Sequence, residues 1–560
     1  MIEEAIEAFR TSFPLGFVAV FPVILLVVSP ITMVDAAHEF SVYRMQQYDL
    51  QGNSHGCRSA LVNAEARTLQ STSMARKCVL LKANELTHAR YLEVLDRGPS
   101  AIVVLISGNM SKEEVQRFMD LEVEMLRIES NLPIYFTYED EELKRIYDQV
   151  THSTSSDSGS AFQTIMSSAT SVGYLFVTNK GQSKAQPDQA LVNIEGILPG
   201  LGMEEQLPTI AIVAHYDAFG IAPYLSHGAN SDASGVVTLL ELARVLGKIY
   251  GNSRTHPRHN ILFLLSGGGK FNYQGSKKWI EDASDNAGSS EAVSSALLNN
   301  AKLVLCLDSL GGNGVHALKM HVSKPPSETT VAGQIHRNIQ SVAKSVDSSL
   351  DTSVVHKKIR LSSDLLAWEH ERYSIRRLHA VTLSALSNSD DPMRRSIMDT
   401  KKTVDVDALT NNVQIIAESV LRYLYNVTEE TDVNLASGDY AIHKDHIEAW
   451  LSYLAEQPRP AQALSDDHHI VTALEAALQK HVKNTRRIKF KADKRDPDFV
   501  FYDGLVQTMS ASIVRSAVFD LYVTGFVAAY MAIVYLIVLK FNGVVLVASK
   551  LSSLPKVKVH

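Results

Sequence analysis

Three short stretches of the chain carry side chains whose types and spacing could do hydrolytic chemistry. The stretch "VAHYDAFG" contains His215 and Asp217, and "GANSDASG" contains Ser231 and Asp232. Asp308 ends a third stretch, "LVLCLD". Imidazole and carboxylate groups are ligands that zinc takes in hydrolytic sites, and a further carboxylate can serve as the general base. These residue types therefore point to metal-dependent hydrolysis.

The stretch "LLSGGGKFNYQG" supplies neither an acid nor a base where such a site would need them. An apolar strand is predicted to end here, and Gly267, Gly268, Gly269 and Lys270 follow it. In α/β enzymes the ends of strands often carry catalytic groups. The glycines could also suggest a phosphate-binding loop, but the Walker spacing and the Ser or Thr after the lysine are absent.

These motifs resemble the co-catalytic zinc aminopeptidase and carboxypeptidase family. In that family the order is His-x-Asp, then Gly-Ala-x-Asp-(Asn/Asp)-Ala-Ser-Gly, then a Glu-Glu pair after the next strand, then an Asp and a late His. Two zinc ions repel each other, so one carboxylate bridges them while another deprotonates the bridging water. The resemblance implies that His215 is a zinc ligand, that Asp217 orients it, and that Asp308 is the later Asp ligand.

The rest of that site is missing from this chain. Ser231 takes the position of the bridging Asp, and Asp232 follows one residue later. The Glu-Glu pair falls on Gly269, at the general-base position, and on Lys270, whose cation would repel a metal ion by on the order of several kcal/mol. No histidine occurs between residues 380 and 442. We therefore expect a pseudo-peptidase with no catalytic residue, metal or cofactor. His215 and Asp308 would be remnants of the lost zinc site.

Other roles for the retained residues stay open from the sequence alone. Ser231 and Asp232 fit the N-cap of the following helix, and His215 fits a hydrogen-bonded structural group. His215, Asp308 and a shifted Asp232 could instead hold a single zinc ion, although hydrolysis without a base would be slow. An active zinc metallopeptidase is the least favoured of the functions considered.

The elements that must position these residues follow an α/β pattern between residues 161 and 428. Continuous apolar runs predict strands buried on both faces, hence a mostly parallel sheet flanked by helices. The stretch "GVVTLLELARVLGK" repeats apolar residues at helical spacing. The fold class is therefore α/β, with an aminopeptidase-like domain. Its predicted strands are Thr209–His215, Ile261–Ser266, Leu303–Asp308 and Ala380–Leu386.

Two further regions flank this domain. Residues 37–160 predict an α/β lobe of their own. Residues 429–515 predict a mainly helical region, and the mixed-charge run 483–498 within it is expected to be a solvated stalk. The elements predicted in the first region are strands at Ala101–Ser107 and Ile134–Glu139, a helix opened by Ser111, and a linker at His152–Ser160.

Both ends of the chain predict a membrane protein. Residues 1–36 predict a signal peptide cleaved after Ala36, or an uncleaved signal anchor because the first residues are acidic. Residues 516–539 predict a transmembrane helix, and its one charge, Asp520, is a candidate contact with a membrane partner. The tail 540–560 carries lysines and no acid, so the positive-inside rule places it in the cytosol and the bulk of the chain in the lumen, as a single-pass type I protein.

Weaker signals agree with a location in the endoplasmic reticulum membrane. Asn109 and Asn426 lie in glycosylation sequons. Lys556 and Lys558 are spaced like a cytosolic dilysine retrieval signal. The other interpretation of that tail is a basic segment next to anionic lipid.

Composition excludes some classes of protein. The net charge of −7 argues against direct binding to nucleic acid. The 3 cysteines allow at most one disulfide, Cys57 with Cys78, and the alternative is that they are small buried thiols.

Several long motifs resemble the nicalin family, a nicastrin-related and degenerate branch of the zinc aminopeptidase-like superfamily. They include "PTIAIVAHYDAFG", "SGGGKFNYQG", "HVSKPP", "LAWEHER" and "KADKRDPDFVFYD". The resemblance implies a NOMO-like lumenal partner, a small multispanning partner of the transmembrane protein 147 type, and a ribosome-translocon assembly. It implies a non-catalytic scaffold that acts with the multipass translocon in membrane-protein biogenesis. The alternative is a nicastrin-like substrate receptor that holds peptide ends in the old cleft, with Lys270 as anchor.

Overall fold

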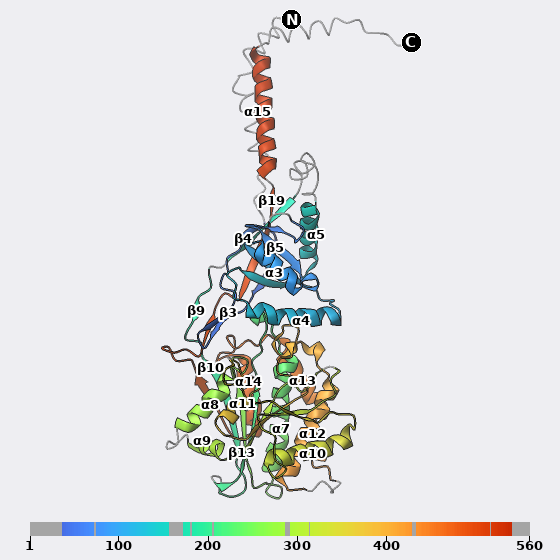
Figure 1. Ribbon diagram of the computed structural model, residues 1–560, viewed down its shortest axis with the longest axis vertical. Helices are drawn as coiled ribbons and strands as arrows, with labels where there is room; N and C mark the ends of the chain where they lie inside the picture. Colours follow the sequence, from blue (N-terminus) through green and yellow to red (C-terminus); the bar gives the residue numbers. More distant parts are fainter. Residues whose placement is uncertain are drawn as a thin grey trace, which may run out of the picture.

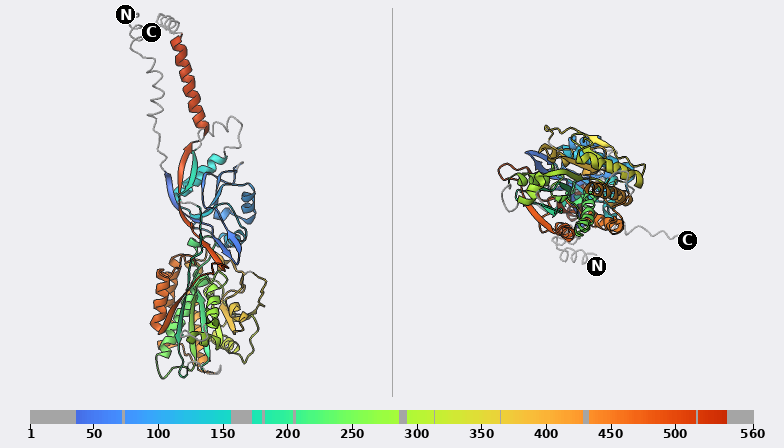
Figure 2. Two further views of the ribbon diagram at one scale, coloured as in Figure 1. Left: turned by 90° about the vertical axis from the view of Figure 1, so that its left-hand side faces the viewer. Right: turned by 90° about the horizontal axis from the view of Figure 1, so that it is seen from below.

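A computed structural model describes residues 36–71, 74–155, 172–179, 182–203, 206–285, 292–312, 314–363, 365–427, 433–515 and 517–539. Two lobes are stacked along the long axis, and helix α15 (Ala517–Leu539) extends from the upper lobe (Figures 1 and 2). The predicted signal peptide, apart from its last residue, and the tail with Lys556 and Lys558 lie outside the described residues.

The upper lobe, here called the barrel lobe, is a closed sheet in the order β1-β19-β8-β4-β5-β6-β7. Its parallel part, β4-β5-β6-β7, contains both strands predicted for the first region. Helix α4 starts where Ser111 predicts it, because the Ser111 Oγ accepts the Glu114 N–H at 3.2 Å in a capping box. The elements are β1 (Ala36–Arg44), β4 (Asn63–Arg67), β5 (Cys78–Lys82), η1 (Ala83–Glu85), α3 (His88–Asp96), β6 (Ala101–Ile106), α4 (Lys112–Arg127), β7 (Ile134–Tyr138), α5 (Glu141–Ser155), β8 (Val172–Thr178) and β19 (Val506–Arg515).

Three separate parts of the chain build this lobe. β8 and β19 come from outside residues 37–160, so the prediction of a self-contained first lobe is incomplete. The linker predicted at residues 152–160 is also wrong at its start, since α5 continues to Ser155.

The lower lobe, here called the peptidase-like lobe, contains an eight-stranded sheet in the order β15-β14-β16-β13-β11-β12-β10-β17. The central strands β16, β13, β11 and β12 are parallel, as predicted, but β10, β14 and β17 run antiparallel to their inner neighbours, so the sheet is mixed. The strands are β10 (Leu191–Leu198), β11 (Thr209–His215), β12 (Asn260–Ser266), β13 (Ala301–Leu307), β14 (Lys319–Val322), β15 (Val354–His356), β16 (Ala380–Ser384) and β17 (Asn484–Phe490).

Helices cover this sheet and build its largest apolar core. Helix α7 lies where the helical spacing predicts it, and all but two of its residues are buried. The helices are α7 (Ser234–Tyr250), α8 (Gln274–Asp285), α9 (Ala292–Asn299), α10 (Val331–Val346), α11 (His370–Ile375), α12 (Val406–Leu424), α13 (Lys444–Glu456) and α14 (His469–His481). Short helical turns are η4 (Pro223–Leu225), η5 (Ala229–Ala233), η6 (Pro392–Arg395), η7 (Lys401–Thr403) and η8 (Gly438–Tyr440).

The prediction of a mainly helical region at 429–515 is right for α13 and α14 and wrong after residue 483. The expected stalk contains β17, an edge strand paired with β10. Its arginines meet acids: Arg486 pairs with Glu195 at 3.1 Å, and Arg487 pairs with Glu475. The start of the charge run is therefore a paired strand, because each cation of β17 meets a carboxylate from another element or loop.

The two lobes share a small sheet and a buried junction. The sheet has the order β3-β2-β18-β9 and joins β2 (Gln47–Leu50), β3 (Asn53–Gly56), β9 (Ala185–Gln186) and β18 (Phe499–Tyr502). At the junction, Glu122 of α4 is fully buried and accepts the Ile397 N–H at 3.1 Å and the Ser396 hydroxyl. Burial raises the pKa of Glu122 to about 8, although both hydrogen bonds favour its charged form.

Helix α15 coincides with the predicted transmembrane segment and displays exposed apolar side chains, among them Leu521, Phe526 and Leu536. Over the residues that the structure describes, no helix meets the combined length and hydropathy expected of a membrane span. The side chain of Asp520 lies outside the described part.

All three cysteines are buried and free, so Cys57 and Cys78 do not form the disulfide considered from the sequence. The Cys57 thiol donates to the Leu132 carbonyl at 2.7 Å instead. The sequon residues Asn109 and Asn426 are both exposed.

Candidate functional site

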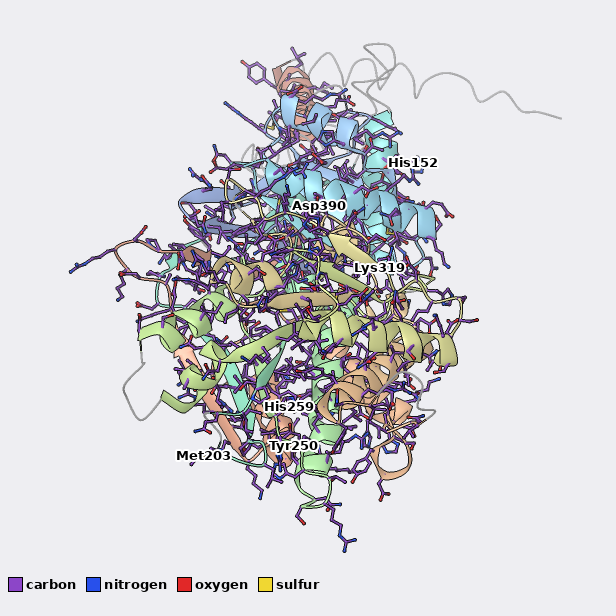
Figure 3. All side chains as sticks on the ribbon, turned by 60° about the horizontal axis from the view of Figure 1, so that its bottom comes forward. His152, Met203, Tyr250, His259, Lys319 and Asp390 are labelled. Atoms are coloured by element: carbon purple, nitrogen blue, oxygen red, sulfur yellow. The ribbon has the colours of Figure 1, made fainter. Side chains whose placement is uncertain are left out.

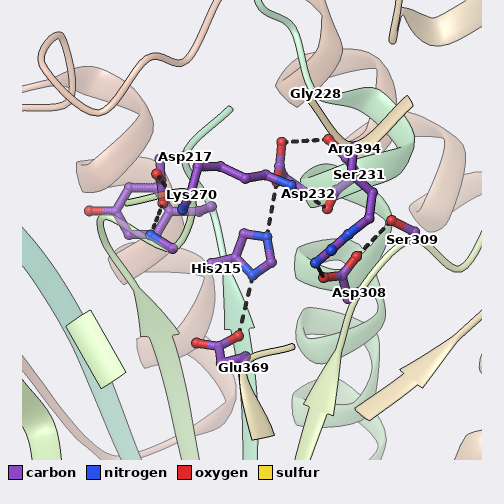
Figure 4. A network of polar contacts seen from close by, with 12 residues as sticks. His215, Asp217, Gly228, Ser231, Asp232, Lys270, Asp308, Ser309, Glu369 and Arg394 are labelled. Atoms are coloured by element: carbon purple, nitrogen blue, oxygen red, sulfur yellow. Dashed lines mark hydrogen bonds and ion pairs between the residues drawn. The ribbon is translucent and has the colours of Figure 1, made fainter. Parts of the chain in front are cut away.

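The residues singled out in the sequence meet at the carboxyl ends of the parallel strands (Figure 4). His215 is the last residue of β11, and Asp308 directly follows β13. Lys270 comes from the loop after β12, and Asp232 from η5, which leads into α7. All four side chains are buried. The sheet therefore brings together the residues that the motif predicts.

His215 lies between two carboxylates. Its Nδ1 is 3.2 Å from Glu369 Oε2, and its Nε2 is 3.1 Å from Asp232 Oδ1. Burial by itself would lower the pKa of His215, but these carboxylates outweigh it and raise that pKa to about 10. The ring is therefore an imidazolium at neutral pH, and an imidazolium has no free nitrogen lone pair for a metal.

Lys270 occupies the other side of Asp232. Its Nζ is 2.8 Å from Asp232 Oδ1, and it donates to the Ser231 carbonyl at 3.4 Å. Burial would raise the pKa of Asp232, but Lys270 and His215 hold it below the usual value. Two protein cations thus neutralise the carboxylate that a metal ion would need.

The N-cap role expected for Ser231 and Asp232 is wrong. α7 is preceded by the π-helical turn η5, and no side chain caps it. The Ala233 N–H donates to the Gly228 carbonyl at 2.9 Å, so it does not need a side chain as acceptor. The Asp232 carboxylate faces His215 instead of capping the helix. Gly228 has φ +59°, and a Cβ there would lie 2.0 Å from Asp232 Oδ2, so the turn requires glycine.

Asp308 is paired with a cation as well. Arg394 of η6 donates from Nη2 to Asp308 Oδ2 at 2.6 Å, and its guanidinium lies 4.2 Å from the centre of the Trp368 ring. The Ser309 hydroxyl donates to the other carboxylate oxygen at 2.6 Å. Burial would raise the pKa of Asp308, but Arg394 holds it far below its usual range.

Gly269 leaves no room for a general base. Its N–H donates to Asp217 Oδ1 at 2.7 Å, and a Cβ at this position would lie 2.2 Å from the Cβ of His215. Asp217 also accepts the Lys270 N–H at 3.2 Å. Asp217 therefore holds the backbone of this loop, and the role of orienting His215 expected for it belongs to Glu369.

Comparisons with known proteins identify the family. Residues 193–420 match the family described as "Peptidase family M28". The human protein named "BOS complex subunit NCLN" is 44% identical over 556 residues, covering 97% of each chain. The Caenorhabditis elegans protein named "Nicalin" is 31% identical, covering 89% of this chain and 90% of its own. This chain belongs to the nicalin family.

A solved structure shares the fold of this nicalin-family chain. The crystal structure of the gamma-secretase component nicastrin superposes with a TM-score of 0.59 and covers 85% of this chain and 99% of its own. The two sequences are 11% identical over that match, so the likeness concerns the fold alone.

Two residues that complete the site were not predicted. Glu369 accepts hydrogen bonds from Ser266 Oγ at 2.8 Å and Ser276 Oγ at 2.6 Å, besides its contact with His215. Arg394 was not assigned a role either. The stretches "LAWEHER" and "DPMRRS" contain them. A single sequence does not show that Glu369 contacts His215 or that Arg394 contacts Asp308 in the folded chain.

The donor set of this nicalin-family site does not fit a zinc ion. His215 carries a proton, while Asp232 and Asp308 are each bonded to a cation, so the single-zinc alternative would require breaking two buried ion pairs. Within the described ranges, no group of three or more His, Cys, Asp and Glu side chains is arranged around a common metal position.

Proposed function

We propose that this chain is a non-catalytic lumenal scaffold subunit of an endoplasmic reticulum membrane complex that acts with the multipass translocon in membrane-protein biogenesis. One observation carries the proposal. The strand ends where peptidase chemistry would take place hold a buried network in which Lys270 and Arg394 neutralise the remaining acids. Relatives named as BOS complex subunits, 44% identical over 97% of this chain, support a role within a complex.

The proposed membrane arrangement is single-pass type I. A signal peptide at residues 1–36 leads the chain into the lumen, α15 anchors it, and the tail with Lys556 and Lys558 returns it to the endoplasmic reticulum. The exposed apolar side chains of α15 support burial in lipid, because such a surface is unfavourable in water. A NOMO-like protein would dock on the lumenal lobes, and a small multispanning protein of the transmembrane protein 147 type would contact α15 near Asp520.

A substrate receptor anchored by Lys270 is not favoured. The Lys270 ammonium is 2.8 Å from Asp232 and its side chain is 5% exposed, so a peptide carboxylate would have to displace a buried internal partner.

The test is a mild-detergent purification of the tagged full-length chain from its own membranes, with quantified co-purifying proteins. We expect one large lumenal protein and one small multispanning protein in near-equal amounts. The Asp520→Leu variant should lose the small protein and keep the large one. A chain that purifies alone, with neither partner, would refute the scaffold role.

A further inference from the structure

A pocket of about 420 Å³ lies at the junction of the two lobes, outside the network around His215. Leu126 and Arg127 of α4 contribute from the barrel lobe, and Tyr48 of β2 contributes from the shared sheet. The peptidase-like lobe contributes Phe219, Glu371 and residues within 357–363, 365–367 and 389–395. Asp390, labelled in Figure 3, lies beside α4 at this junction. Because both lobes form the walls, the pocket exists only when the lobes are docked.

Arg395 is the residue that points to a ligand. It is half-buried in this pocket, and no described acceptor forms a hydrogen bond or ion pair with its guanidinium. Its neighbour Arg394 differs, since both of its terminal nitrogens donate hydrogen bonds, to Asp308, Tyr273 and backbone carbonyls. A half-buried cation without an acceptor is unfavourable in the free protein. An anionic group in the pocket would satisfy it with a bidentate contact.

Other charges at the pocket favour an anion. Arg360 and Lys358 are exposed at the rim, and neither has a described acceptor. The acids of the pocket accept local donors: Glu371 accepts the Ala367 N–H at 3.2 Å, Asp391 accepts the Met393 N–H at 3.0 Å, and Asp390 accepts the Ser389 hydroxyl at 3.4 Å. Lysine and arginine side chains outnumber the acids along the pocket, so its charge favours an anionic ligand.

The remaining wall is apolar, which fits a peptide. Tyr48 and Phe219 pack edge to face with their ring centres 5.8 Å apart, and Leu126, Leu365 and Leu366 complete this side. An apolar surface next to an unpaired cation suits an acidic residue followed by an apolar one, as in an extended peptide.

We propose that this interlobe pocket binds a short acidic peptide segment of a lumenal protein, with Arg395 holding a carboxylate and the Tyr48–Phe219 wall holding a neighbouring apolar side chain. The proposal rests on the lumenal scaffold role and adds a recognition site to it. The anchor is Arg395, while Lys270 stays within the internal network.

The test is a binding measurement with the detergent-purified full-length chain. The probe is a fluorescein-labelled hexapeptide of alternating glutamate and leucine, followed by fluorescence anisotropy, and its glutamine counterpart is the matched peptide. We expect saturable binding of the acidic peptide that is at least tenfold tighter than that of the glutamine peptide. Arg395→Gln should weaken it at least tenfold, whereas Arg254→Gln, a change at an exposed arginine outside the pocket, should leave it unchanged.

A second readout separates a binding role from a structural one. An unpaired cation adds little to stability, so Arg395→Gln should keep or raise the midpoint of thermal unfolding. Arg360→Gln, at the rim of the pocket, should weaken binding of the acidic peptide severalfold. Equal binding of both peptides, full binding by Arg395→Gln, or displacement by inorganic phosphate at lower concentration than by glutamate would overturn the proposal. If both partners still co-purify while neither peptide binds, the pocket proposal fails and the scaffold role stands.

Discussion

At the scale of single residues, Lys270 changes what the strand ends can do. A carboxylate there would add negative charge beside Asp232 and attract a divalent ion. The ammonium instead forms an internal ion pair whose two side chains are 5% and 0% exposed. A buried pair of this kind is costly to break by removing one partner, because the other charge stays buried and unpaired.

The Lys270→Met variant should therefore be strongly destabilised, by about 3–5 kcal/mol. Thermal or denaturant unfolding followed by tryptophan fluorescence would measure the change in the free energy of unfolding. Lys278→Met is the matched control. Lys278 pairs with Asp282 on one helix and both side chains are partly exposed, so the change should cost about 1 kcal/mol or less. Adding Asp232→Asn to Lys270→Met should recover part of the loss; no recovery would mean that the pair is not the cause.

A buried acid at the lobe junction predicts how stability depends on pH. The pKa of Glu122 is raised from 4.5 to about 8 in the folded chain. Between these values the unfolded carboxyl has lost its proton while the folded one keeps it, so the free energy of unfolding falls as pH rises through this window. His215, with a pKa raised to about 10, adds a second decline between about 6.5 and 10, because its stabilisation is fully present only below its unfolded pKa.

The Glu122→Gln variant should remove the first decline, on the order of a few kcal/mol across the window, and keep the second. Midpoints of thermal unfolding measured from pH 5 to 9 for both proteins would show it. Parallel curves for the variant and the unchanged protein would contradict the pKa assigned to Glu122.

At the scale of elements, β19 is the strand on which the barrel lobe depends. It pairs with β1 on one side and with β8 on the other, so removing it opens the barrel and leaves two unpaired strand edges. It also lies late in the chain, next to α15, so the barrel lobe is completed only when the residues up to 515 are in place.

A chain that ends at residue 483 should therefore fail to form the barrel lobe, while one that ends at residue 515 should fold. Limited proteolysis and size-exclusion chromatography after expression into the lumen would compare the two. A protease-resistant monomer from the shorter chain would show that β17 and β19 are dispensable.

Long apolar runs and helical spacing made the centre of the fold predictable. The strands around β11, β12 and β13 and the helices α4 and α7 were all recognised in this way. β17 and β19 were missed because both strands contain polar residues that a sequence pattern assigns to the surface. In the folded chain Arg487 pairs with Glu475, and Gln507 is buried. The site was half predicted: motif spacing located His215 and Lys270, but Glu369 and Arg394 reach them through contacts between distant segments.

At the scale of the whole molecule, two lobes are stacked with α15 at the end of the barrel lobe (Figure 1). In the proposed arrangement this places the peptidase-like lobe farthest from the membrane. Large surfaces of both lobes would then face the lumen, where partner proteins can reach them.

Glycosylation tests this orientation. Asn109 is an exposed residue of the barrel lobe and Asn426 of the peptidase-like lobe, so both should carry glycans if the lobes are lumenal. Digestion with an endoglycosidase should increase gel mobility, and Asn109→Gln and Asn426→Gln should each remove one glycan. Mobility that digestion leaves unchanged would contradict lumenal placement.

The central claim is that protein cations have taken the place of catalytic metal ions. Elemental analysis of the purified full-length chain, after exposure to excess zinc and removal of free metal, tests it most directly. The account predicts well below one zinc per chain and a midpoint of unfolding that a chelator does not change. One or two zinc ions per chain, with a midpoint that falls on chelation, would contradict it.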